Sequence, residues 1–215
     1  MSKIKIAIQG ELGAYSHIAV EKIYKDAEIK TCSTFEDTFK QAYNDPKYKI
    51  IIPIENSLAG RVADIHYLLP KYKLQIHGEY FLQVEHNLLG KPEATIDDIK
   101  YVRSHAQAIS QCQKIISKNN FKTIISVDTA GSAKDLAQGE DKTIAAIASD
   151  LSAKMYNLKI LQKNIEDDKG NVTRFLIMGK NIEQPDYDKN KKYITSCIFR
   201  VKSEPSALYK CLGGF

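Results

Sequence analysis

The sequence lacks the features of a membrane or secreted protein. No apolar run approaches the roughly 20 residues that a helix needs to cross a bilayer. Residues 1–5 lead straight into a strand-like stretch, without an apolar signal segment or a cleavage site. The hydrophobic fraction of 43% and the charged fraction of 27% are typical of a soluble globular chain, so we expect a cytoplasmic location.

Patterns of metal and disulfide sites are also missing. None of the five histidines and four cysteines has the spacing of a zinc site or a redox pair. Without a secretory context, disulfide bonds are not expected. We therefore predict no metal and four reduced, mostly buried thiols, at Cys32, Cys112, Cys197 and Cys211.

Nucleotide and nucleic-acid motifs are equally scarce. The stretch Gly10-Glu11-Leu12-Gly13 lacks the third glycine of the dinucleotide fingerprint, and no Gly-Lys-Ser/Thr phosphate loop occurs. The net charge is +5, but the lysines are scattered and form no basic stripe with aromatic platforms. We expect neither partner, whereas a mild positive excess suits a small anionic substrate.

Strand-like and helix-like segments alternate along most of the chain. Strands are predicted at residues 4–8, 49–54, 74–77, 80–88, 100–103, 123–127, 143–148 and 174–178, and helices at about 16–27, 35–43, 62–69, 109–116, 130–137 and 149–156. This alternation predicts an α/β protein with mostly parallel sheets and helices on both faces.

The same pattern suggests two lobes and a tail. The long alternating segment near residue 84 predicts a crossover, with lobe 1 at about 1–75 and 166–180 and lobe 2 at about 76–165. Residues 181–192 are polar and contain Pro185, which indicates a linker. A further strand is predicted at 193–201, followed by a turn that opens a helix at 204–209.

Small polar residues recur where a predicted strand gives way to a helix. They lie at Gly10–Ser16, Glu55-Asn56-Ser57, Ser104-His105-Ala106-Gln107, Thr129-Ala130-Gly131-Ser132 and Ser149. In parallel α/β sheets such junctions meet at the carboxyl ends of the strands, where helix N-termini favour anions. Ordinary helix capping is the favoured explanation for any one of them, whereas five together favour a ligand cleft as much as capping. A cleft for a carboxylate or phosphate and a set of simple caps therefore both remain open.

A few positions could take part in chemistry. Glu55 follows a buried strand, where a carboxylate could orient hydroxyls or merely occupy a surface turn. Ser104 and His105 do not suit a nucleophile–base pair, because adjacent side chains point apart, so capping or binding is favoured. Thr173 and Arg174 alternate across a strand, so one could face the cleft, and an arginine suits a bidentate carboxylate contact.

Taken in order, several motifs resemble one enzyme family. They are Pro53-Ile54-Glu55-Asn56-Ser57-Leu58-Ala59-Gly60, Ser104-His105-Ala106-Gln107-Ala108 with Gln111-Cys112, Asp128-Thr129-Ala130, Ala145-Ala146-Ile147-Ala148 and Asn171-Val172-Thr173-Arg174-Phe175. This is the order seen in prephenate dehydratases, and Gly10–Ser16 resembles their opening motif. The resemblance covers about residues 3–180. It implies a two-lobed fold similar to type II periplasmic binding proteins, an active site between the lobes, and a homodimer or homotetramer.

The resemblance also implies an activity and a set of roles. Such an enzyme removes CO2 and water from prephenate to give phenylpyruvate, in L-phenylalanine biosynthesis. Because the ring becomes aromatic, no electron-sink cofactor is needed. Thr173 is the implied proton donor, and Glu55, Asn56 and Ser57 would orient it and the substrate. The implied substrate-binding residues are Arg174, Phe175, Ser104, His105, Gln107, Thr129, Ala130 and Asn171.

Residues 193–215 resemble the start of the family's ACT domain, a regulatory module that binds L-phenylalanine. Ser206, Ala207 and Leu208 would belong to its first effector motif, although Ser206 stands where glycine is usual. The second effector motif and most of the domain are absent from the sequence. We expect L-phenylalanine to act as an effector only if the domain is completed.

Three other functions remain open. The enzyme could act on arogenate, the amino analogue of prephenate, since the sequence does not identify the groups that distinguish the two. The chain could instead be a non-catalytic module of the same fold that binds small anions. It could also be a regulatory binding protein that has lost activity, which the full set of motifs disfavours.

Overall fold

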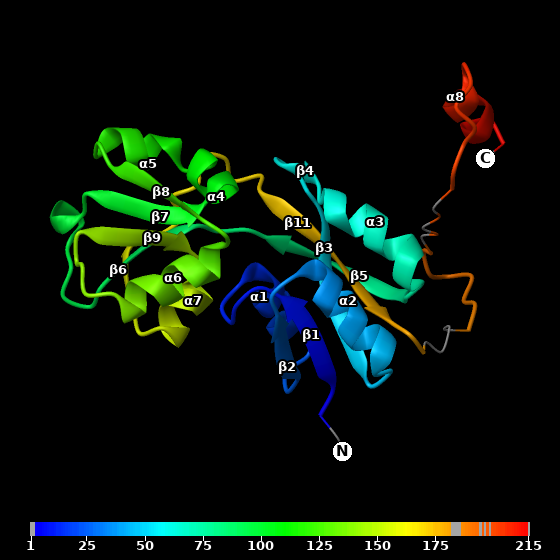
Figure 1. Ribbon diagram of the computed structural model, residues 1–215, viewed down its shortest axis with the longest axis horizontal. Helices are drawn as coiled ribbons and strands as arrows, with labels where there is room; N and C mark the ends of the chain where they lie inside the picture. Colours follow the sequence, from blue (N-terminus) through cyan, green and yellow to red (C-terminus); the bar gives the residue numbers. More distant parts are fainter. Residues whose placement is uncertain (1–2, 182–185, 194, 196, 198, 215) are drawn as a thin grey trace. The chain divides into compact units, whose positions relative to one another are not determined.

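The computed structural model describes residues 3–181, 186–193, 195, 197 and 199–214. The chain divides into two compact units, Met1–Ile182 and Glu183–Phe215. The first unit contains two β-sheets, and each sheet carries helices on both of its faces (Figure 1). We call the part built on the sheet that contains β1 lobe 1, and the other part lobe 2.

Lobe 1 combines the beginning and the end of the first unit. Its strands are β1 (Lys5–Gln9), β2 (Glu28–Cys32), β3 (Tyr48–Asn56), β4 (Gly60–Arg61), β5 (Gln75–Gln83) and β11 (Val172–Gly179), and its helices are α1 (Tyr15–Ile23), α2 (Phe35–Asn44) and α3 (Ala63–Tyr72). The sheet order is β2-β1-β3-β11-β5, and β4 pairs with β3. β1 runs parallel to β2 and β3, whereas β11 is antiparallel to β3 and β5.

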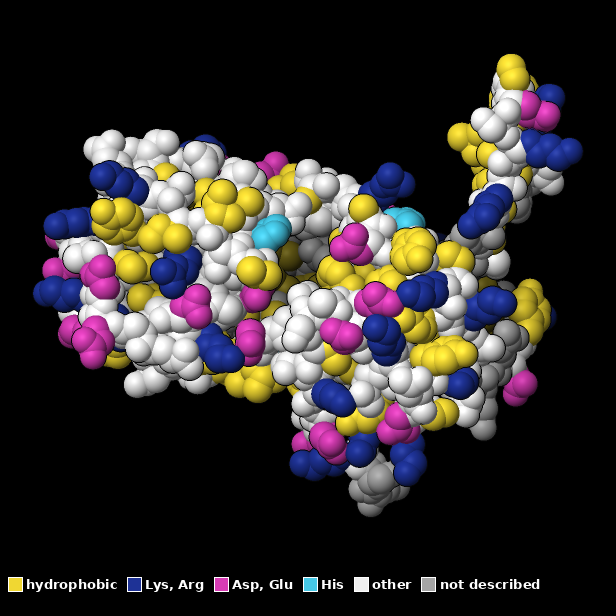
Figure 2. All heavy atoms as spheres, in the orientation of Figure 1, with side chains coloured by type: hydrophobic (Ala, Val, Ile, Leu, Met, Phe, Trp, Pro, Cys, Tyr) yellow, Lys and Arg dark blue, Asp and Glu magenta, His cyan; other side chains and the backbone are white. Residues whose placement is uncertain are grey.

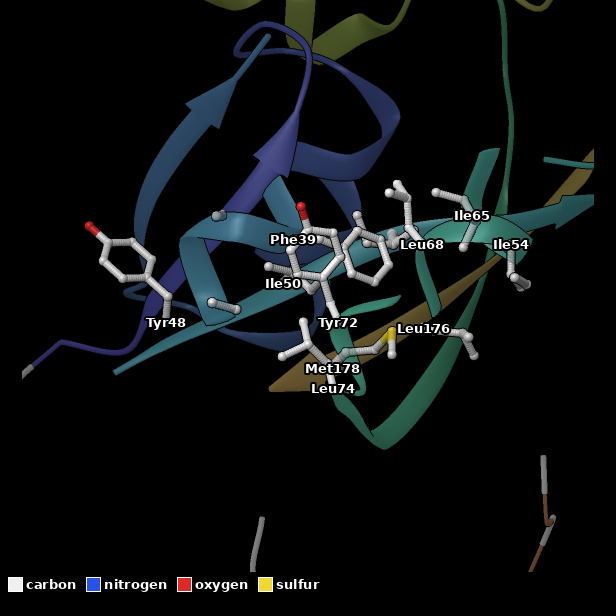
Figure 3. Packing of buried hydrophobic residues seen from close by; sticks show 13 residues of the cluster. Phe39, Tyr48, Ile50, Ile54, Ile65, Leu68, Tyr72, Leu74, Leu176 and Met178 are labelled. Carbon is white, nitrogen blue, oxygen red and sulfur yellow. The ribbon is translucent and has the colours of Figure 1, made fainter. Parts of the chain in front are cut away.

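The run of isoleucines in β3 is buried on both faces of the sheet. Ile50 and Ile52 pack with Phe39 of α2, as Figure 3 shows for Phe39 and Ile50, whereas Ile51 packs with Val20 of α1. Consecutive side chains of a strand point to opposite faces, so an unbroken apolar run can supply two helix layers. Each fully buried isoleucine contributes about 1.5–3 kcal/mol. This burial anchors the strand whose last residue is Asn56.

Lobe 2 is formed by the middle of the chain. Its strands are β6 (Asn87–Gly90), β7 (Tyr101–His105), β8 (Lys122–Ser126), β9 (Ile144–Ala148) and β10 (Lys159–Gln162), and its helices are the 3-10 turn η1 (Ile96–Asp98), α4 (Ala106–Ser110), α5 (Gln113–Lys118), α6 (Thr129–Gln138) and α7 (Asp150–Met155). The order is β10-β6-β9-β7-β8. α4 and α5 pack on one face of this sheet and α6 and α7 on the other (Figure 1).

The predicted α/β class and the predicted division into two lobes are confirmed by the structure, which has two sheets flanked by helices. The sheets, however, are mixed rather than mostly parallel, because β6 and β11 run antiparallel where the chain changes lobe. The predicted lobe boundary near residue 75 is too early. β5 pairs with β11 along its whole length, so the chain leaves the first sheet only after Gln83.

Other differences concern short elements. The predicted strands 74–77 and 80–88 are joined in one strand, β5, which ends at Gln83, and residues 87–88 belong to β6 in lobe 2. Strands β2 and β10 are not predicted, because each is a largely exposed edge strand without a clear apolar alternation. The predicted helix 109–116 breaks into α4 and α5 at Gln111 and Cys112. This break has a consequence for the site, since it presents Gln111 to the other lobe.

The second unit contains one described helix, α8 (Ala207–Leu212), where the sequence predicts one. The described residues of the predicted strand 193–201 lie in no strand, while residues 194, 196 and 198 lie outside the described residues. None of the described helices is long and apolar enough to cross a membrane. The prediction of mostly buried thiols is wrong, because Cys112 is buried, Cys32 and Cys211 are half-buried, and Cys197 is exposed.

Candidate active site

A cavity of about 380 Å3 lies between the two lobes, and Figure 2 shows the surface hollowed there. Its walls come from the ends of β1 and β3 and the start of β11 in lobe 1, and from the starts of α4 and α6 in lobe 2. Among the described residues that line it, none is lysine or arginine, and Asp128 is the single acidic one. Any anion bound here would therefore be held mainly by neutral hydrogen-bond donors and by histidines.

Asn56 ends β3, and the following turn fixes the orientation of its amide. Its Oδ1 accepts hydrogen bonds from the backbone N–H groups of Leu58 (3.0 Å) and Ala59 (2.9 Å). Because amide oxygen accepts and amide nitrogen donates, Nδ2 must point the other way. There it donates to Oγ1 of Thr173 (2.9 Å) and to Oδ1 of Asn171 (2.7 Å). The backbone thus sets the direction of both bonds.

Thr173 lies near the start of β11 and faces the cavity with only 9% of its surface exposed. Its hydroxyl oxygen accepts the hydrogen bond from Asn56. Its own O–H makes no hydrogen bond to any residue that the structure describes. A hydroxyl that accepts from an oriented amide keeps its proton free to donate, so Thr173 can offer that proton to a molecule in the cavity.

The network continues from lobe 1 into lobe 2. Asn171 is fully buried, and its Nδ2 donates to Oε1 of Gln111 (2.9 Å), at the break between α4 and α5. The same oxygen lies 2.9 Å from Nε2 of His86, on the segment that joins the lobes. Nδ1 of His86 in turn lies 2.7 Å from the hydroxyl of Tyr15. Hydrogen bonds therefore connect Thr173 to groups on both lobes.

Burial shifts the pKa of two members of this network. Burial lowers the pKa of His86, although the hydrogen bond to Gln111 and the charge of Glu166 act in the opposite direction. Burial also raises the pKa of Tyr15 well above its usual value. Both groups are therefore neutral in the free protein near pH 7. Sequence reasoning did not place Tyr15, Gln111 or His86 in the site; the first two lie within the quoted motifs, but His86 carried no such signal.

Arg174, next to Thr173, is turned away from the cavity. Its Nη2 lies 2.6 Å from Oε2 of Glu79 on β5, and its Nε donates to the same oxygen at 2.7 Å. The guanidinium also lies over the ring of Phe81 at 5.9 Å. Alternation along β11 puts neighbouring side chains on opposite faces. The predicted contact of Arg174 with a substrate carboxylate is therefore not formed by this arrangement.

Two more predicted residues lie outside the cavity wall. Glu55 is exposed, and its strand neighbours in register are Arg61 and Arg174. Ser57 donates its hydroxyl to the carbonyl of Gly170 (2.6 Å). Its Oγ also accepts from the backbone N–H of Val172 (2.9 Å). Ser57 thus ties the polar loop before β11 to the end of β3, which positions Asn171 and Thr173 rather than the substrate.

Ser104 and Ala130 are structural in this arrangement. Ser104 is fully buried and donates its hydroxyl to the carbonyl of Ile147 (2.7 Å), which joins β7 to the neighbouring strand β9. Ala130 is fully buried in the first turn of α6. Neither side chain lines the cavity.

The structure brings the remaining predicted residues together around the cavity. They are Asn56, His105, Gln107, Thr129, Asn171, Thr173 and Phe175. Nδ1 of His105 accepts from the N–H of Gln107 (3.3 Å) at the start of α4. Asp128 accepts from the N–H of Gly131 (2.6 Å) and caps α6, which Thr129 begins. Within the described part of the chain, no group of three or more His, Cys, Asp or Glu side chains is placed to hold a metal ion.

The loop between β1 and α1 docks lobe 1 onto lobe 2. The carbonyl of Gly13 accepts hydrogen bonds from the hydroxyls of Ser149 (2.6 Å) and Ser152 (3.0 Å), and Tyr156 donates to the carbonyl of Leu12 (2.8 Å). Gly13 has a φ of 91°, and a Cβ there would lie 2.6 Å from Oγ of Ser152. Only glycine fits this approach, which also places Ala14 and Tyr15 in the cavity wall.

Comparisons with known proteins point to one enzyme family. The sequence profile described as "PDT: Prephenate dehydratase" matches residues 6–183. A bifunctional N-acyl-homoserine lactone acylase/prephenate dehydratase of Komagataeibacter europaeus is 38% identical over 97% of this chain and 74% of its own length. Prephenate dehydratase of Methanocaldococcus jannaschii is 39% identical over 94% of this chain and 74% of its own.

Plant and structural relatives complete the comparison. Arogenate dehydratase/prephenate dehydratase 2 of Arabidopsis thaliana is 37% identical over 100% of this chain, which spans 56% of that protein. The crystal structure of prephenate dehydratase from Staphylococcus aureus has a TM-score of 0.75 at 26% identity, covering 97% of this chain and 77% of that one. The enzyme from Arthrobacter aurescens, solved in complex with L-Phe, has a TM-score of 0.84 at 22% identity, covering 99% and 72%, and shows the shared fold. Together with the profile match over most of its length, these relatives show that the chain belongs to the prephenate dehydratase family.

Proposed function

We propose that this chain converts prephenate to phenylpyruvate by decarboxylating dehydration, the reaction for which its family is named. The observation that carries the proposal is the hydroxyl of Thr173. It faces the cavity, accepts from Asn56 and keeps its own proton for a ligand. An arrangement whose donor is oriented before the substrate arrives is what stabilisation of a leaving oxygen requires.

Prephenate carries two carboxylates and a ring hydroxyl on a ring that is not aromatic. In the reaction, the bond between the ring and its carboxylate breaks and CO2 leaves. The electron pair of that bond moves into the ring, and the C–O bond to the hydroxyl breaks at the opposite position. The departing hydroxide takes a proton that is finally supplied by the solvent, and the products are phenylpyruvate, CO2 and water. The gain of aromaticity drives these steps, so the protein has to align the bonds and assist the leaving group.

Thr173 would assist the leaving hydroxide as a hydrogen-bond donor. An alcohol is too weak an acid to be deprotonated outright near pH 7. However, the hydrogen bond it accepts from Asn56 polarises its O–H and strengthens the bond that it donates. One such donor at a developing negative oxygen is worth about 2–4 kcal/mol in the transition state.

The lobe 2 wall would hold the carboxylates. Thr129 begins α6, a ten-residue helix whose first N–H groups carry a partial positive charge. Gln107 and His105 add side-chain donors beside it. Phe175, on the floor of the cavity, would pack against the ring of the substrate. Binding is thus assigned mainly to one lobe and bond breaking to the other.

A direct assay tests the proposal. Purified protein is mixed with prephenate at neutral pH, and phenylpyruvate is measured by its absorbance after base is added. The expected result is product in excess of the uncatalysed reaction, with loss of most turnover in Thr173→Ala while the fold survives. Saturable binding of prephenate without product would instead favour the non-catalytic binding module.

Arogenate is a second candidate substrate, and one observation favours it. Asp128 is the single acidic residue among the described residues that line the cavity, and a carboxylate suits the ammonium group of arogenate. Asp128 already caps α6, which leaves it fewer free lone pairs for a ligand. Rates on both substrates decide the matter. If arogenate is preferred and Asp128→Asn removes that preference, the second candidate stands.

Regulation and assembly are further parts of the proposal. Residues 1–180 would form the catalytic domain, 181–192 the linker, and 193–215 the start of an ACT domain, in a cytoplasmic homodimer or homotetramer. Ser206 has a φ of 63°, in the left-handed region that favours the glycine usual at this position. The effect of millimolar L-phenylalanine on kcat/KM of residues 1–215 tests whether this motif acts by itself. Inhibition would show that Ser206, Ala207 and Leu208 suffice for control.

A further inference from the structure

His86 lies at the centre of the hydrogen-bond network, and the steps above give it no task. It lines the cavity, its surface is only 3% exposed, and it sits on the segment between β5 and β6 that joins the lobes. Its backbone N–H donates to Oε2 of Glu166 (2.9 Å), which holds the residue in place. Its ring meets the ring of Tyr15 edge-on, with centroids 5.6 Å apart.

The proton position on Nε2 of His86 follows from the backbone at Leu58 and Ala59. Those two N–H groups make Asn56 donate to Oδ1 of Asn171, and this in turn makes Nδ2 of Asn171 donate to Gln111. Gln111 therefore presents its oxygen, not its nitrogen, to Nε2 of His86. Only an N–H can make an attractive contact there, because a bare nitrogen would face an oxygen lone pair at 2.9 Å.

A second proton on His86 can be accepted without moving a heavy atom. The hydroxyl of Tyr15 lies 2.7 Å from Nδ1 of His86 and 2.9 Å from the carbonyl oxygen of Glu85, but it has one proton to donate. When His86 is neutral, Tyr15 donates to Nδ1 and the carbonyl receives nothing from it. When His86 is protonated, Nδ1–H donates to Tyr15 and Tyr15 donates to the carbonyl. Both forms of the ring are thus accommodated by turning one O–H.

The charges around His86 favour a proton when an anion arrives. The acid that acts on the ring of His86 is Glu166, which also accepts from its backbone N–H. The acidic groups that act on its partner Tyr15 are Cys112, Glu166, Asp150 and Glu85. Burial keeps His86 neutral in the free protein, against the pull of Gln111 and Glu166. No lysine or arginine is present among the described residues that line the cavity. Of the two histidines that line the cavity among the described residues, His86 is buried and His105 is exposed, so the charge of a doubly negative ligand would act most strongly on His86 and favour its imidazolium form.

We propose that His86 is a positioning residue and that it takes up one proton from solvent at Nδ1 when a doubly negative substrate binds. As a positioning residue it donates its Nε2–H to Gln111. Gln111 in turn holds Asn171 and Asn56, which orient the hydroxyl of Thr173. The proton uptake rests on the proposed function, since prephenate supplies the two charges. The Nε2–H arrangement does not depend on the substrate.

Nitrogen-15 NMR of the histidine side chains tests both parts. In the free protein, His86 should carry its proton on Nε2, with Nδ1 bare. In the inactive Thr173→Val variant saturated with prephenate, both ring nitrogens should be protonated. The signals of His86 are identified by their loss in His86→Gln, or in His86→Asn if the first variant does not fold, and His105→Gln should leave them in place. A proton on Nδ1 in the free protein, or a ring that stays neutral with bound prephenate, would overturn the proposal.

A pair of substitutions separates positioning from a merely structural role. In His86→Gln the amide nitrogen replaces Nε2 and can still donate to Gln111. In His86→Asn the amide reaches toward Tyr15 instead, so Oε1 of Gln111 keeps the hydrogen bond from Asn171 and loses the one from residue 86. Loss of one of the two hydrogen bonds to this buried oxygen is worth up to about tenfold, so kcat should be several-fold and at most about tenfold lower in His86→Asn than in His86→Gln. Both variants should lose the proton uptake. Equal kcat values in two folded variants would contradict positioning through Nε2. A wild-type protein that makes no phenylpyruvate would reject the proposed function. In that case the ring nitrogen of His86 that carries the proton in the free protein, measured by NMR, still tests the hydrogen-bond network.

Discussion

On the lobe 1 side of the cavity, Asn56, Asn171 and Thr173 hydrogen-bond to one another, and two backbone N–H groups set the direction of the series. On the lobe 2 side, His105 and Gln107 are exposed, and the bond between them uses a main-chain N–H of Gln107. Side chains of the first wall are held before a ligand arrives, whereas in the second wall the amide of Gln107 makes no hydrogen bond to any residue that the structure describes and can adjust to a ligand. We infer that the pre-oriented side chains of lobe 1 assist bond breaking and that the exposed side chains of lobe 2 bind the substrate. Substitutions in the lobe 1 wall should therefore change mainly kcat, and those in the lobe 2 wall mainly KM.

The largest effect is expected from Asn56→Asp. The carboxylate keeps the shape of the amide but has no N–H, so Thr173 should turn its proton toward Asp and away from the cavity. We expect kcat to fall about 100- to 1,000-fold, as when an oriented donor is removed, with a small change in KM. Steady-state kinetics with prephenate measures both. Asn44→Asp, on the exposed end of α2, is the matched control.

The second-largest effect is expected at Gly13, in the loop that docks lobe 1 onto lobe 2. Gly13→Ala forces a Cβ against Ser152 and a non-glycine residue into a positive φ. We expect a loss of about 1–3 kcal/mol in the free energy of unfolding, measured by urea denaturation. Gly78→Ala, in β5, is the control, because a Cβ there would meet nothing closer than 3.9 Å and its φ is not positive. If Gly13→Ala were as stable as the parent, the loop would not be docked on α7 as described.

The lobe 2 wall should show the opposite kinetic pattern. Gln107→Ala removes one exposed donor from the binding wall without touching Asn56 or Thr173. We expect KM to rise about three- to tenfold, the worth of one hydrogen bond of roughly 1 kcal/mol, while kcat changes little. A large fall of kcat at unchanged KM would erase the distinction between the two walls.

The smallest effect is expected from Arg174, although it neighbours Thr173. Its partner Glu79 is half-buried, so Arg174→Met should cost about 1 kcal/mol of stability, with turnover kept within about threefold of the parent. A double-mutant cycle with Glu79→Gln measures the pair, and thermal unfolding with prephenate turnover supplies the two readouts. Loss of activity comparable to that of Asn56→Asp would show that Arg174 contacts the substrate.

Much of the fold and part of the site were accessible from the sequence. Apolar periodicity located most strands and helices. The motif resemblance predicted Asn56, Asn171 and Thr173 as site residues, and all three line the cavity. Arg174 was assigned to the wrong side, because its environment depends on the register between β11 and β5, which brings Glu79 beside it. Tyr15 and His86 are separated by 71 positions and Gln111 and His86 by 25, so their contacts arise only when the two lobes close on the connecting segment.

The most direct measurement compares turnover of Thr173→Val, Thr173→Ser and the parent on prephenate. Valine keeps the shape of threonine and removes the hydroxyl, whereas serine keeps the hydroxyl that Asn56 orients. The account predicts that kcat falls about 100-fold or more in the valine variant and that serine restores most of it. Near-normal turnover of folded Thr173→Val would contradict the central claim that this hydroxyl assists the departing hydroxide.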